Sequence, residues 1–511
     1  MSDDFLTSEQ TENYGRYVAE PNEVQLARYF HLDERDLAFI NQRRGKHNRL
    51  GIALQLTTAR FLGTFLPDLL QIPSFIRFYI AAQLNISRPE ILSRYAERDN
   101  TRWEHQGLIK LYYDYHDFGD FPWSFRLKRL LYTRAWLSNE RPGLLFDFAT
   151  AWLLQNKILL PAASTLTRLI GEVRERASRR LWRRLALLPD SWQKTQLDGL
   201  LEIPEGQRMS VLEEMRKGPV TISGPSFTDA LERYTRLRSM EFSRLNFSGL
   251  PAIQLRNLAR YAGMASVKYI SRMPDERRLA VLTAFVKAQE ISALDEAVDV
   301  LDMLILDITR SAKNIGQKKR LRTLKDLDRA ALLLARACTL LLDENTDEAA
   351  LRQAIFRRIP KDKLAESVGK VNELARPQDT HFQDEMVEQY GRVKRFLSAM
   401  LRDLHFQAAP AGEHTLSAIH YLAELSGSKK RILDDAPEQI ISGPWKRLVY
   451  DRDGRILRAG YSLCLLERLQ DSLRRRDLWL ENSDRWGDPR QKLLQGAEWQ
   501  AQRIQIGRAH V

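Results

Sequence analysis

Hydrophobic positions recur every three or four residues along most of the chain, and this spacing predicts a protein built mainly from α-helices. The pattern is clearest in residues 161–188, where a single apolar stripe follows the predicted helix. The stripe consists of Leu166, Leu169, Ile170, Val173, Ala177, Leu181 and Leu185. A helix with such a stripe is expected to bury that side in a core. Pro161 suits the approach to this helix, and Ser164 or Thr165 suits its N-cap.

The same stretch carries seven arginines, which differ in their position relative to the stripe. Four of them fall off the stripe: Arg168, Arg176, Arg179 and Arg183. Arg180 and Arg184 would crowd into it, so we expect the helix to bend, to end early, or to let these two side chains reach out to water. Only Glu172 and Glu175 can pair with arginines inside the stretch. The excess of cations favours an external anionic partner.

A second helical pattern, residues 144–156, directly precedes this stretch, and the two together have the outline of a helix-turn-helix motif. In that motif the first residues of the second helix reach base edges in DNA. We therefore expect base contacts from Ser164, Thr165, Thr167 and Arg168. Arg176, Arg179 and Arg183 would then neutralise phosphates. The alternative is a surface helix with a solvated charged face, which most arginine-rich helices are.

Residues 43–49, with the sequence RRGKHNR, form a cationic turn between helices expected at residues 33–42 and 50–62. Asp33 suits the N-cap of the first of these helices. The turn has four cations and no acid, and these side chains are candidates for phosphate contact: Arg43, Arg44, Lys46 and Arg49. An exposed loop with incidental charge is the alternative.

Two further segments predict local structure. Residues 294–343 predict two long helices about a basic stretch, in which Lys318, Lys319 and Arg320 are candidates for DNA contact and a solvated helix end is the alternative. Residues 444–461 contain Asp453 and Gly454 between short apolar runs, which predicts one small β-hairpin near the C-terminus.

Clusters of proline, glycine and polar residues mark expected boundaries that divide the chain into five segments. These are a first helical DNA-binding module at residues 1–68 and a second, with the helix-turn-helix, at 69–190. A linker at 191–227, helical modules at 228–405, and a hairpin with a helix at 406–511 follow.

Charge is the compositional feature that bears most on function. The 511 residues carry a net charge of +13 and an isoelectric point of about 9.6, which is typical of proteins that bind nucleic acid. The two cysteines predict neither disulfides nor a zinc site. No charge-free apolar run approaches membrane-spanning length and no secretion signal is evident, so we expect a cytoplasmic protein with no membrane partner.

The sequence shows none of the common catalytic or cofactor signatures. A phosphate-binding loop, a dinucleotide-binding glycine pattern, paired zinc-ligand cysteines and a serine nucleophile elbow are all missing. No catalytic or metal-ligating residue is nominated, and no cofactor is expected for the chain as it stands.

Four stretches, in this order, resemble the N-terminal half of the Tn-three family of bacterial transposases, the replicative enzymes of class II transposons. They are RYFHLDERDLAFINQRRGKHNRLGIALQL, LLPAASTLTRLIGEVRERA, RRLAVLTAFVKAQEISALDEAVDVLDMLI and SLRRRDLWLENSDRWGDPR. The resemblance runs from about residue 24 to residue 494. Each stretch alone is a loose motif, and their order and spacing make the resemblance specific.

The resemblance implies a mostly helical, multidomain arm that binds the terminal inverted repeats of a transposon and helps to dimerise two ends. It also implies a bacterial, nucleoid-associated protein. In this family a DDE carboxylate triad holding two Mg²⁺ ions cleaves and transfers DNA strands, and its domain follows the region of the last motif.

The chain ends soon after that motif, in IGRAHV, which resembles the translation of a common sequencing adapter. We therefore expect a truncated product that is not an enzyme and lacks the Mg²⁺-dependent domain. Two other functions remain open: a helical scaffold for acidic proteins, and an RNA-binding regulator that uses the same cations.

Overall fold

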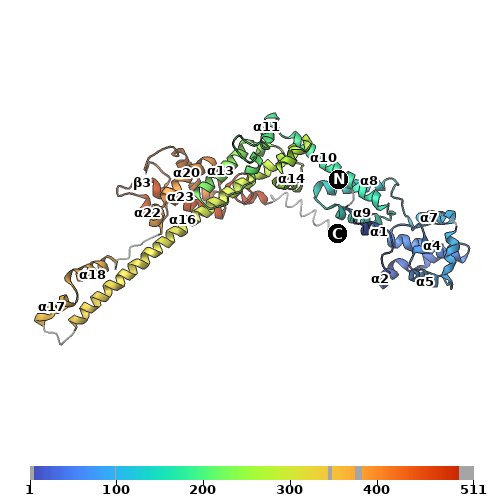
Figure 1. The fold of residues 1–511 in the computed structure, drawn as a ribbon, viewed down its shortest axis with the longest axis horizontal. Coiled ribbons are helices and arrows are strands. Elements are labelled where there is room, and N and C mark those ends of the chain that lie inside the picture. Colours follow the sequence, from blue (N-terminus) through green and yellow to red (C-terminus); the bar gives the residue numbers. More distant parts are fainter. Residues whose placement is uncertain (1–4, 98, 343–347, 375–381, 494–511) are drawn as a thin grey trace. The chain divides into compact units, whose positions relative to one another are not determined.

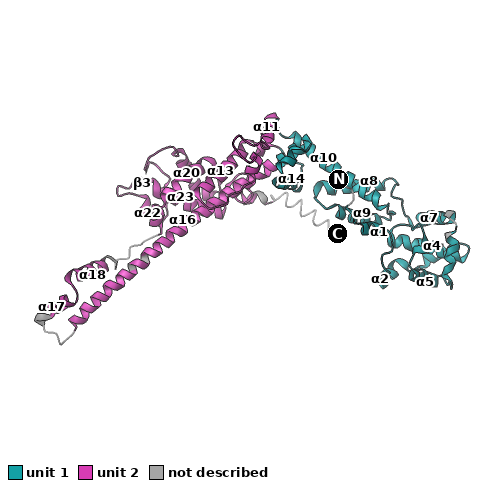
Figure 2. Ribbon diagram, viewed as in Figure 1, with its two compact units in different colours: residues 1–190, 246–284 teal, residues 191–245, 285–511 magenta. Residues whose placement is uncertain are grey.

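The computed structural model describes residues 5–97, 99–342, 348–374 and 382–493. Within these ranges the fold is mainly α-helical, as the hydrophobic pattern predicts, with a few short strands (Figure 1). Figure 2 shows the two units of the chain: unit 1 contains residues 1–190 and 246–284, and unit 2 contains residues 191–245 and 285–511. The five segments expected from the sequence stay a prediction.

Unit 1 consists of helices joined by short turns. Its α-helices are α1 (Ser8–Asn13), α2 (Glu23–Gln25), α3 (Glu34–Asn41), α4 (Lys46–Leu62), α5 (Ser74–Gln83), α6 (Leu92–Ala96), α7 (Asp99–Tyr113), α8 (Trp123–Leu137), α9 (Pro142–Gln155), α10 (Ala163–Leu187), α14 (Ala252–Met264), α15 (Val267–Ser271) and the start of α16 (Asp275–Leu341). A π-helical turn, η1 (Leu26–Phe30), continues α2, and two 3₁₀ turns are η2 (Leu69–Gln71) and η3 (Pro89–Ile91).

The hydrophobic residues of unit 1 gather in separate cores. The first surrounds α4, whose residues Leu50, Ile52, Leu54 and Leu56 are fully buried. The second lies between α8, α9 and the first half of α10. In a third cluster the second half of α10 packs with Trp136 and with α14. Because α4 is buried around most of its circumference, it is the central helix of its core.

The stripe predicted for α10 is confirmed, because all seven of its residues are buried. The prediction for the start of this helix is wrong. α10 begins at Ala163 after Ala162, and no side chain caps it. Ala163 is itself buried in the second core. Packing therefore draws the chain into the helix before Ser164, whose hydroxyl is left for other partners.

Unit 2 combines helices with two small sheets. Its α-helices are α11 (Ser191–Gly199), α12 (Val211–Met215), α13 (Gly224–Ser239), the remainder of α16, α17 (Glu348–Arg358), α18 (Lys361–Leu374), α19 (Gln383–Glu388), α20 (Tyr390–Asp403), α21 (Glu413–Glu424), α22 (Gly443–Val449) and α23 (Arg458–Arg475). The 3₁₀ turns in its described residues are η4 (Phe242–Arg244), η5 (Pro410–Gly412), η6 (Glu438–Ile440) and η7 (Pro489–Lys492). Residues 191–227, expected to be a linker, hold α11, α12 and the start of α13.

The sheets of unit 2 are two-stranded and antiparallel. β1 (Phe406–Ala408) pairs with β4 (Leu478–Leu480), with Phe406 opposite Leu480. β2 (Ile432–Leu433) pairs with β3 (Ile456–Leu457). Around them α13, α20, α21 and α23 form the core, in which Phe227 packs edge-on against Phe396. Trp445 and Tyr461 are also fully buried.

Two sequence predictions for unit 2 require correction. The two helices expected in residues 294–343 are replaced, in the described part of that stretch, by a single helix, because α16 runs without interruption from Asp275 to Leu341. The basic stretch contains good helix formers, and one glycine, Gly316, does not suffice to end a helix. The predicted hairpin is present in a shortened form: Tyr450 and Ile456 form an antiparallel bridge across a tight turn, in which the Asp451 N–H donates to the Arg455 carbonyl and Gly454 has φ +78°. The run before it is helical because α22 buries Trp445 and Val449.

In the described ranges, none of the helices combines the length and the apolar character that crossing a membrane requires.

The close contact between α4 and Tyr95 gives a test of this packing. A Cβ atom on Gly51 would lie about 2.5 Å from the Tyr95 ring, so Gly51→Ala must displace a fully buried aromatic side chain. We expect a loss of about 1–3 kcal/mol in the local stability of α4, measured by amide hydrogen exchange.

Gly107→Ala on α7 is the matched control, because a Cβ atom there meets nothing within 4 Å. This exposed helical position should gain about 0.5–1 kcal/mol. Equal protection of α4 in the wild type and in Gly51→Ala would show that this contact does not hold the helix.

Candidate nucleic-acid interface

The cations of α10 lie on the sides of the helix that the buried apolar stripe leaves exposed to water. Arg168, Arg176, Arg179 and Arg183 are all exposed. Arg179 forms an ion pair with Glu175, four residues earlier. Among the residues that the structure describes, none forms a hydrogen bond or ion pair with the guanidinium groups of Arg168, Arg176 or Arg183. These three guanidinium groups are therefore open to an external acceptor.

The first turn of α10 separates the candidate base-contacting residues. Ser164 and Arg168 are exposed and lie four residues apart, so they share one side of the helix. Thr165 is half-buried. Thr167 is buried, and its hydroxyl donates to the Ser164 carbonyl at 3.0 Å. Ser164 and Arg168 can reach a ligand directly, whereas the Thr167 hydroxyl is engaged within the helix.

Arg180 and Arg184 lie inside α10, which continues past them to Leu187, and both side chains reach out from the stripe to the surface, as the third alternative expected. Both guanidinium groups lie over the Trp136 ring of α8, at 5.0 and 5.9 Å from its centroid. Arg180 also donates to the Tyr132 hydroxyl at 3.1 Å. Cation–π contacts of this kind hold a charge over an apolar surface without burying it. The cationic surface of α10 therefore continues onto α8.

α8 contributes residues that the sequence reasoning did not nominate. Lys128 and Arg129 are exposed, and Arg129 precedes Tyr132 and Trp136 by three and seven residues, so it lies on the same side of α8. The signal was the alternation of cations and aromatics in WSFRLKRLLYTRAW. That alternation did not show which cations would share a surface with α10, because this depends on how the helices pack.

The four cations of the turn between α3 and α4 have different surroundings. Arg49 donates to the carbonyls of Arg43 and Asn41, at 3.0 and 3.3 Å, and so holds the turn together. Arg43 is half-buried with its guanidinium over the Phe39 ring. Arg44 and Lys46 are exposed, and among the described residues their side chains have no hydrogen-bonding or ionic partner. Two cations thus stabilise the turn and two point outward.

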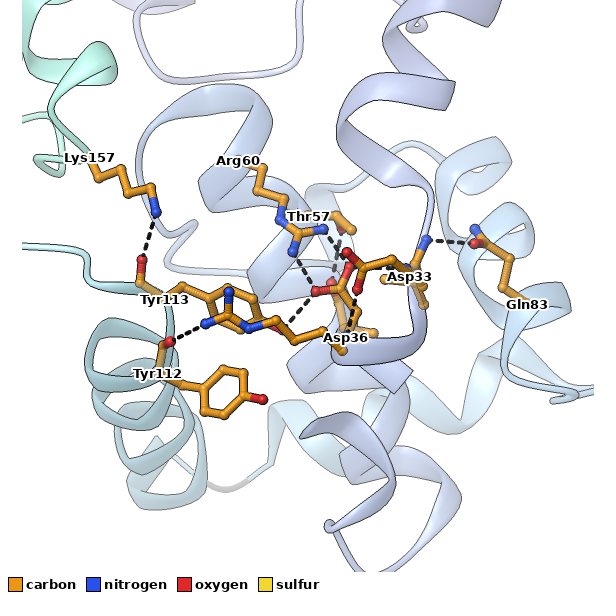
Figure 3. A network of polar contacts seen from close by, with 11 residues as sticks. Asp33, Asp36, Thr57, Arg60, Gln83, Tyr112, Tyr113 and Lys157 are labelled. Carbon is orange, nitrogen blue, oxygen red and sulfur yellow. Dashed lines mark hydrogen bonds and ion pairs between the residues drawn. The ribbon is translucent and has the colours of Figure 1, made fainter. Parts of the chain in front are cut away.

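A buried carboxylate fixes the helices on either side of this turn (Figure 3). Asp36 of α3 is 1% exposed and accepts two hydrogen bonds from Arg60 of α4, at 2.5 and 2.7 Å. The Tyr113 hydroxyl of α7 donates to the same carboxylate at 2.7 Å. Burial alone would raise the pKa of Asp36, but the hydrogen bonds from Arg60 and Tyr113 hold it below its usual value. Asp33 caps α3 as predicted.

The candidates on α16 are placed differently from the sequence expectation. Lys319 binds two carboxylates of α19, Glu385 at 2.8 Å and Glu388 at 3.3 Å. Lys318 is exposed, and the side chain of Arg320 lies outside the described residues. The pairing of Lys319 joins α16 to α19, so this basic stretch has an internal partner.

In the ranges that the structure describes, no three side chains of histidine, cysteine, aspartate or glutamate come together in a way that could hold a metal ion.

Comparisons with known proteins bear on the whole chain. Residues 5–173 match the family described as "Domain of unknown function (DUF4158)". The chain is 79% identical over 509 residues to the transposase for transposon gamma-delta of Escherichia coli (strain K12), a match that covers 100% of this chain and 51% of that protein. It is 29% identical over 476 residues to the transposase for transposon Tn501 of Pseudomonas aeruginosa, covering 93% of this chain and 48% of the relative. Identity to the transposase for transposon Tn1546 of Enterococcus faecium is 26% over 502 residues, covering 97% and 50%.

These matches bear on two sequence predictions. The prediction that the chain is not an enzyme is wrong, because a protein named as a transposase, which is an enzyme, matches 100% of the chain. The matches do not support the prediction of a truncated product, and residues 506–511, on which it rested, lie outside the described residues. The chain spans about half the length of the curated relatives it matches.

The Asp36 network yields a prediction for stability. Asp36→Asn leaves the Arg60 guanidinium largely buried without its carboxylate, so we expect a loss of about 2–3 kcal/mol in the stability of α3 and α4, measured by hydrogen exchange at pH 7. The native pKa of Asp36 lies below its unfolded value, so the unfolded state takes up the proton first on acidification. The extra stability of α3 and α4 in the wild type, relative to Asp36→Asn, should therefore be complete well above pH 4. It should shrink as the pH falls below that value.

Glu34→Gln is the control, because it removes an equal charge from an exposed position in the first turn of α3. We expect it to change stability by about 0.5 kcal/mol through the helix dipole alone. If the two variants behaved alike, the network would not be what fixes the turn.

Proposed function

We propose that the chain is part of a Tn-three family transposase and that its function in DNA transposition is to bind double-stranded DNA at the terminal inverted repeats of the transposon. The observation that carries this proposal is the exposed, acid-poor surface of α10. Arg168, Arg176 and Arg183 stand on it without a partner among the described residues. A folded helix that keeps three such guanidinium groups in water is suited to an external row of phosphates.

The first turn of α10 suits the reading of bases. α9 and α10 pack together, with the turn of residues 156–162 between them, as the two helices of a helix-turn-helix motif do. Ser164 and Arg168 share the side of α10 that would enter the major groove. Arginine at such a position can donate two hydrogen bonds to guanine, and serine can bond to any base. These two residues therefore supply sequence preference in the proposal.

Phosphate contacts come from the later arginines and from α8. Arg176 and Arg183 lie two and four turns further along α10, and Lys128 and Arg129 extend the charge onto the helix beneath it. Beside the core that surrounds α4, Arg44 and Lys46 form a second pair of exposed cations. They lie on the turn that the Asp36 network holds in place. Contacts to phosphates position a protein on DNA and make its affinity sensitive to salt.

We also propose that the whole protein cleaves and transfers DNA strands with Mg²⁺, as the family resemblance implies. The described residues do not fit a Mg²⁺ site, since they bring no suitable trio of ligands together. A homodimer joining two transposon ends and association with the bacterial nucleoid remain part of the same proposal.

Substitutions on α10 should separate base reading from phosphate contact. Arg168→Gln should lower the preference for inverted-repeat DNA over scrambled duplex by about 1–3 kcal/mol, since it removes a base contact. Arg183→Gln should weaken both duplexes alike and reduce the slope of log affinity against log salt by about 1. Fluorescence anisotropy of labelled duplexes over a range of salt concentrations measures both effects.

Lys370→Gln is the matched control, because Lys370 is exposed on α18 of unit 2 and already paired with Glu366. It should leave both duplexes and the salt slope unchanged. Equal affinity of the wild type for inverted-repeat and scrambled DNA would refute sequence-specific recognition. Preference for structured RNA over duplex would instead support the RNA-binding alternative, and binding of acidic proteins that survives nuclease treatment would support the scaffold.

A further inference from the structure

Unit 2 contains a cavity of about 370 Å³ that the proposed duplex interface does not use. One wall is a single side of α20, formed by Tyr390, Lys394, Leu397, Ser398 and Leu401, which follow helical spacing. The other walls come from the end of α21, the loop of residues 425–431 and the start of α23. The volume lies within the range of about 300–1,000 Å³ that is usual for small-ligand sites.

The lining of this cavity divides into an apolar floor and a cationic rim. Leucines form the floor: Leu397, Leu401, Leu422 and Leu457. The charged residues that line the cavity are all basic: Lys394, Lys429, Lys430, Arg431 and Arg458. Tyr390 adds a half-buried aromatic ring. An apolar floor beneath several cations matches a ligand that has a flat apolar part and a phosphate.

Most of the rim charge has no partner inside the protein. Lys430 pairs with Asp434 at 3.2 Å, but both side chains are more than 60% exposed, so this pair is weak. In the described part of the chain, no side chain or backbone group binds the charged ends of Lys394, Lys429 or Arg431. Three like charges around one mouth repel one another, and an anionic ligand would relieve this repulsion.

The fifth cation, Arg458, holds the cavity in shape. Its guanidinium donates to the carbonyls of Ser428 and Leu425, at 2.5 and 3.0 Å. Its backbone N–H donates to the Arg431 carbonyl at 2.9 Å, next to the pairing of β2 with β3. These bonds fix the loop that carries Lys429, Lys430 and Arg431. The rim cations therefore project from a preformed backbone, which lowers the entropy lost when a ligand binds.

We propose that this cavity binds one nucleotide of a single-stranded DNA segment, with its base against the leucine floor and Tyr390 and its phosphate on Lys394 and the loop cations. The proposal rests on the proposed function in taking DNA as the ligand, and it adds a site of a different kind. Bases in a duplex are stacked and paired, so they cannot enter a concave site of this size. A base in a single strand can enter it and stack on an aromatic ring.

Fluorescence anisotropy with the full chain and a labelled oligothymidylate of about ten nucleotides tests the proposal. Lys394→Gln removes one phosphate contact, and we expect Kd to rise about fivefold to tenfold. Ser398→Glu places a carboxylate at the exposed mouth and should have at least as large an effect. An abasic oligonucleotide of the same length should bind about fivefold more weakly, because it lacks the part that occupies the floor.

Arg395→Gln is the matched control, because Arg395 is exposed on α20 next to Lys394 but does not line the cavity. It removes the same charge and should change Kd by less than about twofold. The proposal is overturned if Lys394→Gln and Ser398→Glu both bind the oligonucleotide as the wild type does. Equal losses of oligonucleotide affinity in Arg395→Gln and Lys394→Gln would also contradict it. So would equal affinity of the wild type for the abasic and the intact oligonucleotide.

The two proposals can fail independently. Arg183→Gln should weaken duplex binding and spare the oligonucleotide, whereas Lys394→Gln should do the reverse. If the wild type bound the oligonucleotide with the expected pattern but showed no preference for inverted-repeat duplex, the nucleotide site would stand and duplex recognition would fall. A preference for inverted-repeat duplex without the expected pattern of oligonucleotide binding would contradict the nucleotide site and leave duplex recognition standing.

Discussion

Burial of the apolar stripe of α10 determines which side of this helix meets water. All seven of its residues are buried, and six of them lie in two hydrophobic clusters, one with α8 and α9 and one with Trp136 and α14. Burying a single leucine or isoleucine side chain contributes about 1.5–3 kcal/mol, so no rotation of the helix that exposed the stripe would be tolerated. The arginines between the stripe residues are consequently held outward. Their availability to a ligand follows from the packing beneath them.

Where a cation falls too close to such a stripe, the aromatic residues of a neighbouring helix accommodate it. Arg180 and Arg184 lie over Trp136, and Arg277 lies over Trp182 at 5.0 Å. Each ring provides an apolar surface for the core and an attractive face for the charge. The same residues thus close a hydrophobic cluster and keep a positive surface above it. This arrangement lets a basic chain fold without burying unpaired charge.

Pairing decides which basic segments remain available. Arg60 is held by Asp36, Lys319 by two glutamates of α19, and Arg458 by backbone carbonyls. Each of these cations orders the protein around it. Arg44, Lys46, Arg168 and Lys394 lack such partners among the described residues and project from backbones that paired neighbours or, for Arg168, buried apolar residues hold in place. Both proposed DNA sites, the surface of α10 and the cavity beside α20, thus have unpaired cations on an ordered backbone.

The helical pattern was readable from the sequence because the spacing of apolar residues is a local property: it gave the fold class, the α10 stripe and the cap at Asp33. The family resemblance rested likewise on the order of motifs. Partners distant in the chain were not readable. Nothing in residues 318–320 shows that Lys319 meets α19, and nothing in residues 161–165 shows that Ala163 enters a core and moves the helix start. The cavity under α20 likewise joins residues from 390 to 459. The sequence by itself determined where cations are dense, whereas only the tertiary structure decided which are free, because pairing depends on contacts between helices distant in sequence.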